Sequence, residues 1–353
     1  MAEERIRVDA EKLKALGARE LQAVGVPEEG AKITTEVLVS ADLRGVETHG
    51  IVSLVPFYIK GIQEGRINPN PNITVSGDDL STATVDGDGG LGFMAAHRSM
   101  EEAISRAAKT GSGFVAVKNS NHFGPGFYYA MMALEHDMIG FMLTCSPVPE
   151  VVAPGSSTTA VGTNPLAVAA PCNKKPPFVL DMATSVVAAG KFRKAILEGK
   201  PVPEGWAIDK DGEPITDPHK RTADNGGLLS LGGKPELGVY KGFALGVVVD
   251  ILTAVLAGAK PAVMRTEKKV SHLAGALKIS SFLQVDTFKN IMDEMTEAYA
   301  SLPKLPGVKN IFIAGGLEDE IQKERIANGL PLLPKVIQTL KETAEELGVE
   351  FDL

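Results

Sequence analysis

The sequence predicts an α/β chain with helices at both of its ends. Three observations lead to this fold class. Residues 9–45 carry apolar side chains at helical spacing, residues 81–145 alternate apolar strand patterns with helical ones, and residues 331–348 return to helical spacing. Strands that alternate with helices are typical of α/β folds. Helices at both termini indicate that the two chain ends pack together.

The N-terminal region contains two expected helices, over residues 9–25 and 27–45. The second helix starts with Pro27 at a first-turn position, followed by acidic residues, and Gly45 is placed to end it. The Pro/Asn-rich segment 68–79 then interrupts regular structure. We interpret this segment as a domain boundary.

The middle of the chain is where strands are expected. Residues 81–87, 113–119 and 138–145 have strand patterns, and residues 95–111 form an amphipathic helical pattern between the first two. Residues 242–259 are apolar over almost the length needed to span a bilayer. Because an aspartate lies within this run and no aromatic belt flanks it, we expect a buried core helix.

Composition excludes several classes of protein. The chain has 353 residues, 44% of them hydrophobic and 23% charged, which is typical of a globular protein of two or three domain-sized units. The net charge of −8 and the absence of a basic stripe argue against nucleic-acid binding. Two cysteines and an N-terminus without an apolar core favour a cytoplasmic location.

Standard nucleotide and hydrolase motifs are absent, apart from one glycine pattern. The sequence has no Walker A loop, G-x-S-x-G elbow, H-E-x-x-H pair or C-x-x-C pair. Gly87, Gly89 and Gly92 match G-x-G-x-x-G between a strand and a helix. The next strand, however, ends in Lys118 and Asn119 instead of the acid that would bind a ribose. We favour a tight turn over a dinucleotide fingerprint.

Two histidines differ from the rest because each lies beside glycine at the edge of a regular element. His49 follows the second helix, and His122 follows the strand 113–119 in an amide-rich loop. Imidazole transfers protons near neutral pH, although a structural role is equally compatible with either position.

Further polar residues cluster later in the chain. Thr163 and Asn164 lie in a predicted turn, and Lys241 starts the apolar helix. Asp181, Thr184 and Ser185 lie where a strand is expected to give way to a helix, so they either cap that helix or help it to bind an anion.

Several motifs in a fixed order resemble the type-2 malate/L-lactate dehydrogenase family, from about residue 10 to about residue 330. The motifs are ADLRGVETHG (41–50), GLGFMAAHRSMEEAISRA (90–107), NSNHFGPGFYYA (119–130), GTNPLAVAAP (162–171), LDMATSVVAAGK (180–191), PEGWAIDKDGEPITDP (203–218) and YKGFAL (240–245). The family includes sulfolactate, ureidoglycolate and diketogulonate dehydrogenases and reductases of cyclic imino acids.

The resemblance implies a non-Rossmann α/β fold. It assigns residues 1–70 and 317–353 to one helical domain and residues 71–316 to the α/β region that binds cofactor and substrate. That region is expected to split into two subdomains near residues 120–260. The resemblance also implies NAD or NADP as cofactor, a small-molecule substrate, no metal, no membrane association, and a homodimer or larger homo-oligomer.

The resemblance also implies roles for particular residues. His49, with Thr48 in place of the family's serine, matches the active-site histidine. His122 matches a second histidine that is the acid/base in some members and binds cofactor in others. The remaining implied positions are Thr163 and Ser53 for substrate, and Asp181, Met182, Ala183, Thr184, Lys241 and Gly315 for the cofactor.

The departures from the family concern the substrate. Ser53 stands where the family usually has an arginine that binds a carboxylate, Lys191 stands where some members have aspartate, and AGGLE (314–318) replaces PGEPE. We therefore expect an NAD(P)-dependent oxidoreductase that interconverts a 2-oxo acid and a 2-hydroxy acid such as malate or lactate. The alternatives are a reductase of a cyclic imino acid or a sulfonated hydroxy acid, and a non-catalytic nucleotide-binding paralogue.

Overall fold

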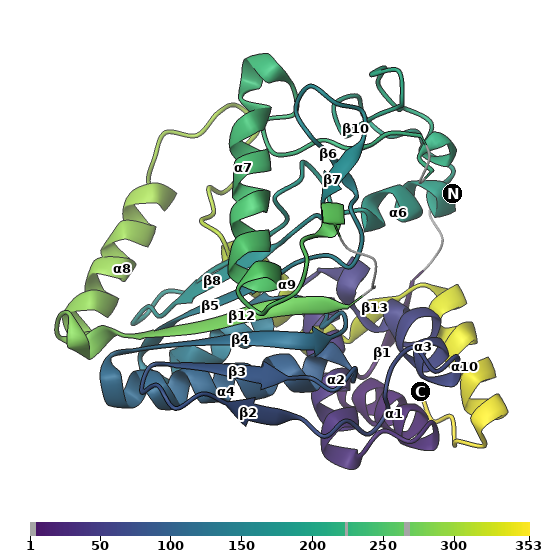
Figure 1. The fold of residues 1–353 in the computed structure, drawn as a ribbon, viewed down its shortest axis with the longest axis horizontal. Helices are drawn as coiled ribbons and strands as arrows, with labels where there is room; N and C mark the ends of the chain where they lie inside the picture. The colour runs from purple at the N-terminus through teal and green to yellow at the C-terminus, as the bar shows by residue number, and fades with distance from the viewer. Residues whose placement is uncertain (1–4, 223–224, 265–268) are drawn as a thin grey trace.

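The main sheet is mixed and largely antiparallel. The computed structural model describes residues 5–222, 225–264 and 269–353 (Figure 1). Within these residues the sheet has seven strands, in which β3 and β4 are parallel and the other neighbours are antiparallel. In spatial order they are β2 (Thr74–Ser76), β3 (Thr82–Asp86), β4 (Ser112–Ser120), β12 (Val270–Lys278), β5 (Met138–Thr144), β8 (Leu166–Ala170) and β9 (Phe178–Met182).

This strand order differs from a doubly wound parallel sheet, so the expected non-Rossmann α/β fold is confirmed. The strands predicted at residues 81–87, 113–119 and 138–145 correspond to β3, β4 and β5.

Two layers of helix cover the sheet. Helix α4 (Gly92–Thr110) packs on β4 and β12, and α5 (Phe127–Met132) packs on β5 and β8. The opposite face is covered by α7 (Val239–Asp250) and its π-helical continuation Ile251–Val255 (Figure 1). Helix α4 packs in this way because its apolar residues repeat every three or four positions: Phe93, Ala96, Met100, Ala103 and Ala107 are all buried.

The first and last helices of the chain, α1 (Ala10–Ala23) and α10 (Pro334–Leu347), lie side by side (Figure 1). Strand β1 (Ile6–Val8) pairs antiparallel with β13 (Leu330–Leu332), and the N-terminal helices contact the C-terminal ones. The N-terminal helices are α1, α2 (Glu28–Leu43) and α3 (Lys60–Gln63), and the C-terminal ones are α9 (Gly316–Asn328) and α10. Helix α8 (Val285–Ala300) lies elsewhere, and its Asp293 accepts hydrogen bonds from the backbone amides of residues 173–175.

A second, smaller apolar core lies apart from the main one. It surrounds a four-stranded sheet and helix α6 (Gly190–Glu198), and includes Val161, Phe192 and Leu228. The order of this sheet is β10 (Ala207–Ile208), β11 (Gly227–Leu228), β6 (Val151–Val152) and β7 (Thr159–Val161). The domain boundaries 1–70 with 317–353, and 71–316, stay a prediction.

The expectation of a buried helix over residues 242–259 is wrong for one face of that segment. The helix rests on the sheet along one side only, which leaves a row of aliphatic side chains exposed: Val248, Ile251, Leu252, Val255 and Leu256. Among the described helices, none combines the length and the apolar character required to cross a membrane.

Candidate active site

The turn that carries His49 is closed around the side chain of Asp42. Helix α2 ends at Leu43, and Gly45 follows with the left-handed φ of 79° that the predicted helix end requires. The buried Asp42 carboxylate accepts a hydrogen bond of 2.7 Å from the amide of Ile51. Gly50 permits this contact, since a Cβ at Gly50 would lie 2.0 Å from Asp42 Oδ1. The chain therefore reverses direction within a few residues and presents His49 at its outer side.

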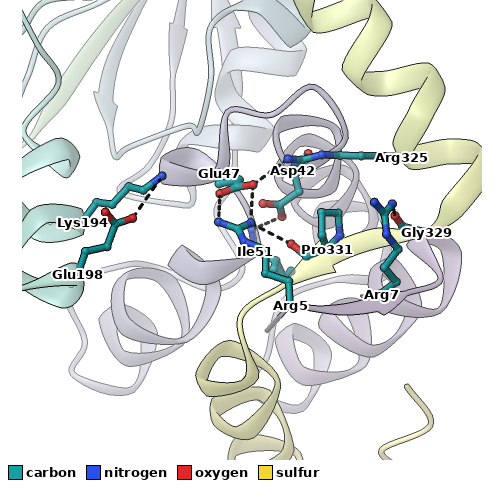
Figure 2. Close-up of polar contacts among 10 residues, drawn as sticks. All are labelled: Arg5, Arg7, Asp42, Glu47, Ile51, Lys194, Glu198, Arg325, Gly329 and Pro331. Carbon is teal, nitrogen blue, oxygen red and sulfur yellow. Dashed lines mark hydrogen bonds and ion pairs between the residues drawn. The ribbon is translucent and has the colours of Figure 1, made fainter. Parts of the chain in front are cut away.

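Glu47 ties the same turn to both ends of the chain (Figure 2). Its carboxylate accepts two hydrogen bonds from Arg5 of β1, of 2.7 and 2.9 Å, and one of 2.8 Å from Arg325 of α9. Arg325 also donates to the Asp42 carbonyl. Burial raises the pKa of Glu47, but the hydrogen bonds and positive charges of Arg5 and Arg325 outweigh it and hold this pKa below its usual range.

The fold brings His49 and His122 together. Their ring centroids are 5.7 Å apart and the rings are inclined by 25°. His49 Nδ1 is 3.0 Å from the hydroxyl of Thr48. Among the described residues, no group hydrogen-bonds to Nε2 of either ring. His49 is half-buried and His122 is exposed, so a small molecule from solvent can reach both.

Tyr58 fixes the protonation pattern of His122. The buried Tyr58 hydroxyl is 2.7 Å from His122 Nδ1, and the amide of Gly124 donates to the same nitrogen over 3.3 Å. An amide N–H only donates, so Nδ1 is an acceptor and the neutral ring carries its proton on Nε2. Burial raises the pKa of Tyr58, which keeps the phenol protonated as a second donor.

Both imidazoles are neutral at physiological pH. Burial lowers the pKa of His49 to about 4, and the positive charge of Arg193 contributes to this shift. Desolvation by the protein packed around His122 likewise lowers the pKa of that ring, with smaller contributions from the charges of His49 and Arg193. The site in the free protein therefore offers two neutral rings, of which His122 carries a donor on Nε2.

A third histidine, His272, contacts the residues on either side of His122. His272 is fully buried, and its two ring nitrogens lie 2.8 Å from Thr144 Oγ1 and 2.9 Å from Ser120 Oγ. Its ring meets Phe123 edge-on at 4.6 Å. Because both of its nitrogens are hydrogen-bonded to side-chain hydroxyls, we interpret His272 as a structural residue that holds Ser120, at the end of β4, in place.

No helix starts in the segment 181–185, so that prediction is wrong: β9 ends at Met182, and a bend at Thr184 and an isolated bridge at Ser185 follow. The amide of Thr184 donates to Thr163 O, and Ser185 forms a bridge with Ser230. These strand-like bonds use the backbone groups that a helix would need, and α6 begins only at Gly190. Asp181 instead accepts from the amide of Phe127 over 2.9 Å and caps α5.

The other predicted site residues lie in several places. Thr163, half-buried, has its hydroxyl 3.1 Å from that of Ser146, and Lys241 is exposed in the first turn of α7. Ser53 is 5% exposed. At Gly315, with φ of 93°, a Cβ would lie 2.9 Å from the amide nitrogen of Val179. Met182 ends β9 and Ala183 follows it, and both are half-buried. The roles given to all of these residues stay predictions.

The space beside Gly92, the last glycine of the pattern at residues 87–92, is occupied by the protein's own backbone. A Cβ at Gly92 would lie 2.1 Å from the carbonyl oxygen of Asn121, so this glycine is needed for packing against the His122 loop. This contact favours the interpretation as a tight turn.

The sequence did not single out Asp42, Glu47, Tyr58 or Arg193. Each acts on the histidines through contacts with other segments of the chain, and no local pattern marks such contacts. One available signal was the run LVPFYI, because Pro56 within a helical segment indicates irregular helix. The structure has a π-helix there, Leu54–Ile59, of the kind that is frequent at functional sites.

Comparison with known proteins identifies a family over nearly the whole chain. The sequence model described as Malate/L-lactate dehydrogenase matches residues 8–341. A malate dehydrogenase from Pyrococcus horikoshii is 42% identical, covering 98% of this chain and 96% of that protein. A malate/(S)-sulfolactate dehydrogenase from Methanothermus fervidus is 36% identical, covering 98% and 99%. The crystal structure of malate dehydrogenase from Entamoeba histolytica superposes with a TM-score of 0.95 at 30% identity, covering 99% and 100% of the two chains.

We predict that Glu47→Gln weakens both the fold and the activity. Loss of the charge removes the ion pairs to Arg5 and Arg325, so the free energy of unfolding should fall by about 2 kcal/mol and turnover by roughly tenfold. Chemical denaturation and steady-state kinetics measure the two effects.

The control is Glu324→Gln, which breaks an exposed ion pair with Arg7 in the same region (Figure 2 shows Arg7). It should change stability by less than about 1 kcal/mol and leave turnover unchanged. Equal losses of turnover in both variants would contradict a specific role of Glu47.

Proposed function

The chain belongs to the malate/L-lactate dehydrogenase family, and from this membership we propose that its paired histidines interconvert a 2-oxo acid and the matching 2-hydroxy acid. The protein is a nicotinamide-dependent oxidoreductase of hydroxy acids. The observation that carries the proposal is the pair of neutral imidazoles, His49 and His122, whose centroids are 5.7 Å apart and whose Nε2 atoms are available to a substrate.

His49 is the proton-transfer residue in this proposal. We assign the ring proton of His49 to Nδ1, facing the Thr48 hydroxyl 3.0 Å away, so that the lone pair of Nε2 takes the hydroxyl proton of a 2-hydroxy acid. His122 cannot do this in its neutral form, because Tyr58 and Gly124 hold its proton on Nε2. Its Nε2–H instead donates a hydrogen bond to the same substrate oxygen. Reduction runs the proton transfer backwards and requires His49 to be protonated first.

The chain also carries groups suited to a nicotinamide cofactor. When bound, the cofactor exchanges a hydride with the substrate carbon that carries the oxygen. Lys241, exposed in the first turn of α7, offers a charged donor to a phosphate oxygen. We include in the cofactor site the residues that the resemblance implies: Asp181, Met182, Ala183, Thr184 and Gly315. NAD and NADP both fit this donor set.

The proposed substrate is malate or lactate. The second candidate is a sulfonated hydroxy acid, which the 36% identity to a malate/(S)-sulfolactate dehydrogenase supports. A cytoplasmic location belongs to the same proposal, and the low cysteine content, two in 353 residues, supports it.

Substrate and chemistry are tested together by a panel of 2-oxo acids, sulfonated oxo acids and cyclic imines, each with NADH and with NADPH. We expect the oxidation of one cofactor with a 2-oxo acid, and a loss of turnover of roughly 10²- to 10⁴-fold in His49→Gln. His122→Gln should lose less, since it removes only a hydrogen-bond donor. Wild-type protein that oxidises neither cofactor with any compound would exclude the proposal.

We also propose that the chain forms a homodimer through the exposed apolar row on α7 and its continuation. Within this row Ile251 and Leu256 are 51% and 59% exposed. Light scattering should give about twice the chain mass of 37.2 kDa, and Ile251→Glu should give the single mass. Leu80→Glu, at an exposed residue elsewhere, is the control, and a monomeric wild type would refute the proposal.

A further inference from the structure

The first turn of helix α6 lies against the turn of His49. A Cβ added at Gly190 would be 3.3 Å from the Cβ of Thr48. Three residues later, the guanidinium carbon of Arg193 lies 4.9 Å from the ring centroid of Phe57, which belongs to the π-helix Leu54–Ile59. Helix α6 thus lies beside both segments that carry the site. Its Arg193 stacks on Phe57, which is four residues after Ser53 in the chain.

Arg193 is an exposed cation that has no anionic partner among the described residues. This separates it from most described arginines, which contact a carboxylate: Arg5, Arg7, Arg19, Arg66, Arg98, Arg106, Arg221 and Arg325. Its positive charge acts on His49, His122 and Tyr58 and lowers the pKa of each. No other cation does so for all three groups in the described chain.

We propose that Arg193 binds the carboxylate of the substrate. This inference rests on the proposed function, because a 2-oxo or 2-hydroxy acid carries its carboxylate on the carbon next to the reacting oxygen. With that oxygen between Nε2 of His49 and Nε2 of His122, the carboxylate needs a cation at the edge of the same pair.

The guanidinium suits this role by its geometry. A planar guanidinium can stack on an aromatic ring with one face and still present an edge of parallel N–H groups to both carboxylate oxygens. Phe57 supplies the ring, so the side chain is oriented before the substrate arrives, which reduces the entropy lost on binding. Ser53 is buried and offers no such charge, so α6 supplies the anion-binding group from outside the segment that follows His49.

The test measures binding of oxamate, a small carboxylate that resembles a 2-oxo acid, by calorimetry on the full chain saturated with NADH or NADPH. Arg193→Met keeps an apolar stem over Phe57 but removes the charge, and oxamate affinity should fall roughly 10- to 100-fold. Arg193→Lys should give an intermediate loss, since it keeps the charge without the paired N–H groups. Lys194→Met, on the same helix, is the matched control and should bind as wild type does.

Kinetics with the substrate found in the panel provide the second measurement. Arg193→Met should raise KM for the acid by a similar factor, with the KM for the cofactor unchanged. Oxamate binding by Arg193→Met within about threefold of wild type, equal losses in Lys194→Met, or no oxamate binding by wild type would each overturn the inference. Wild type that binds oxamate through Arg193 but turns over no acid would refute the proposed function alone.

Discussion

The hydrogen bond from the amide of Ile51 to the buried carboxylate of Asp42 is the constraint from which the site is built. Burial raises the pKa of Asp42 to about 7, so this carboxylate is held at a cost in free energy, partly offset by the Ile51 N–H. Gly50 is required because a side chain there would occupy the position of Asp42. The turn that results is tight enough to end α2 and to direct His49 toward the loop after β4. A looser turn would separate the two imidazoles.

Stability and chemistry are coupled through this turn. Glu47 connects it to β1 through Arg5 and to α9 through Arg325, so the two chain ends hold the segment that carries the reacting histidine. On the other side, Tyr58 from the π-helix and Gly124 from the His122 loop set which nitrogen of His122 carries the proton. Each histidine is therefore oriented by parts of the chain remote from it in sequence.

The periodic elements and the two histidines could be predicted from the sequence, because helix spacing, strand patterns and glycine-flanked loops are local signals. The segment 181–185 could not, since the backbone of Thr184 bonds to Thr163 and Leu231, which only the fold brings near. The same holds for the exposed face of α7, because a run of apolar residues does not reveal which side meets the sheet. The roles of Tyr58 and Arg193 could not be predicted either, because they depend on contacts with His122 and Phe57 that the fold creates.

The fold holds His49 and His122 as a pair of neutral imidazoles in the free protein. Nitrogen NMR of labelled histidine, assigned with His49→Gln and His122→Gln, measures this directly. Both rings should remain neutral from about pH 8 down to about pH 5.5, with His122 protonated on Nε2, because burial lowers the pKa of His49 to about 4 and that of His122 below its ordinary value. Titration of either ring at or above its ordinary pKa of about 6.5, or a proton on Nδ1 of His122, would contradict the account.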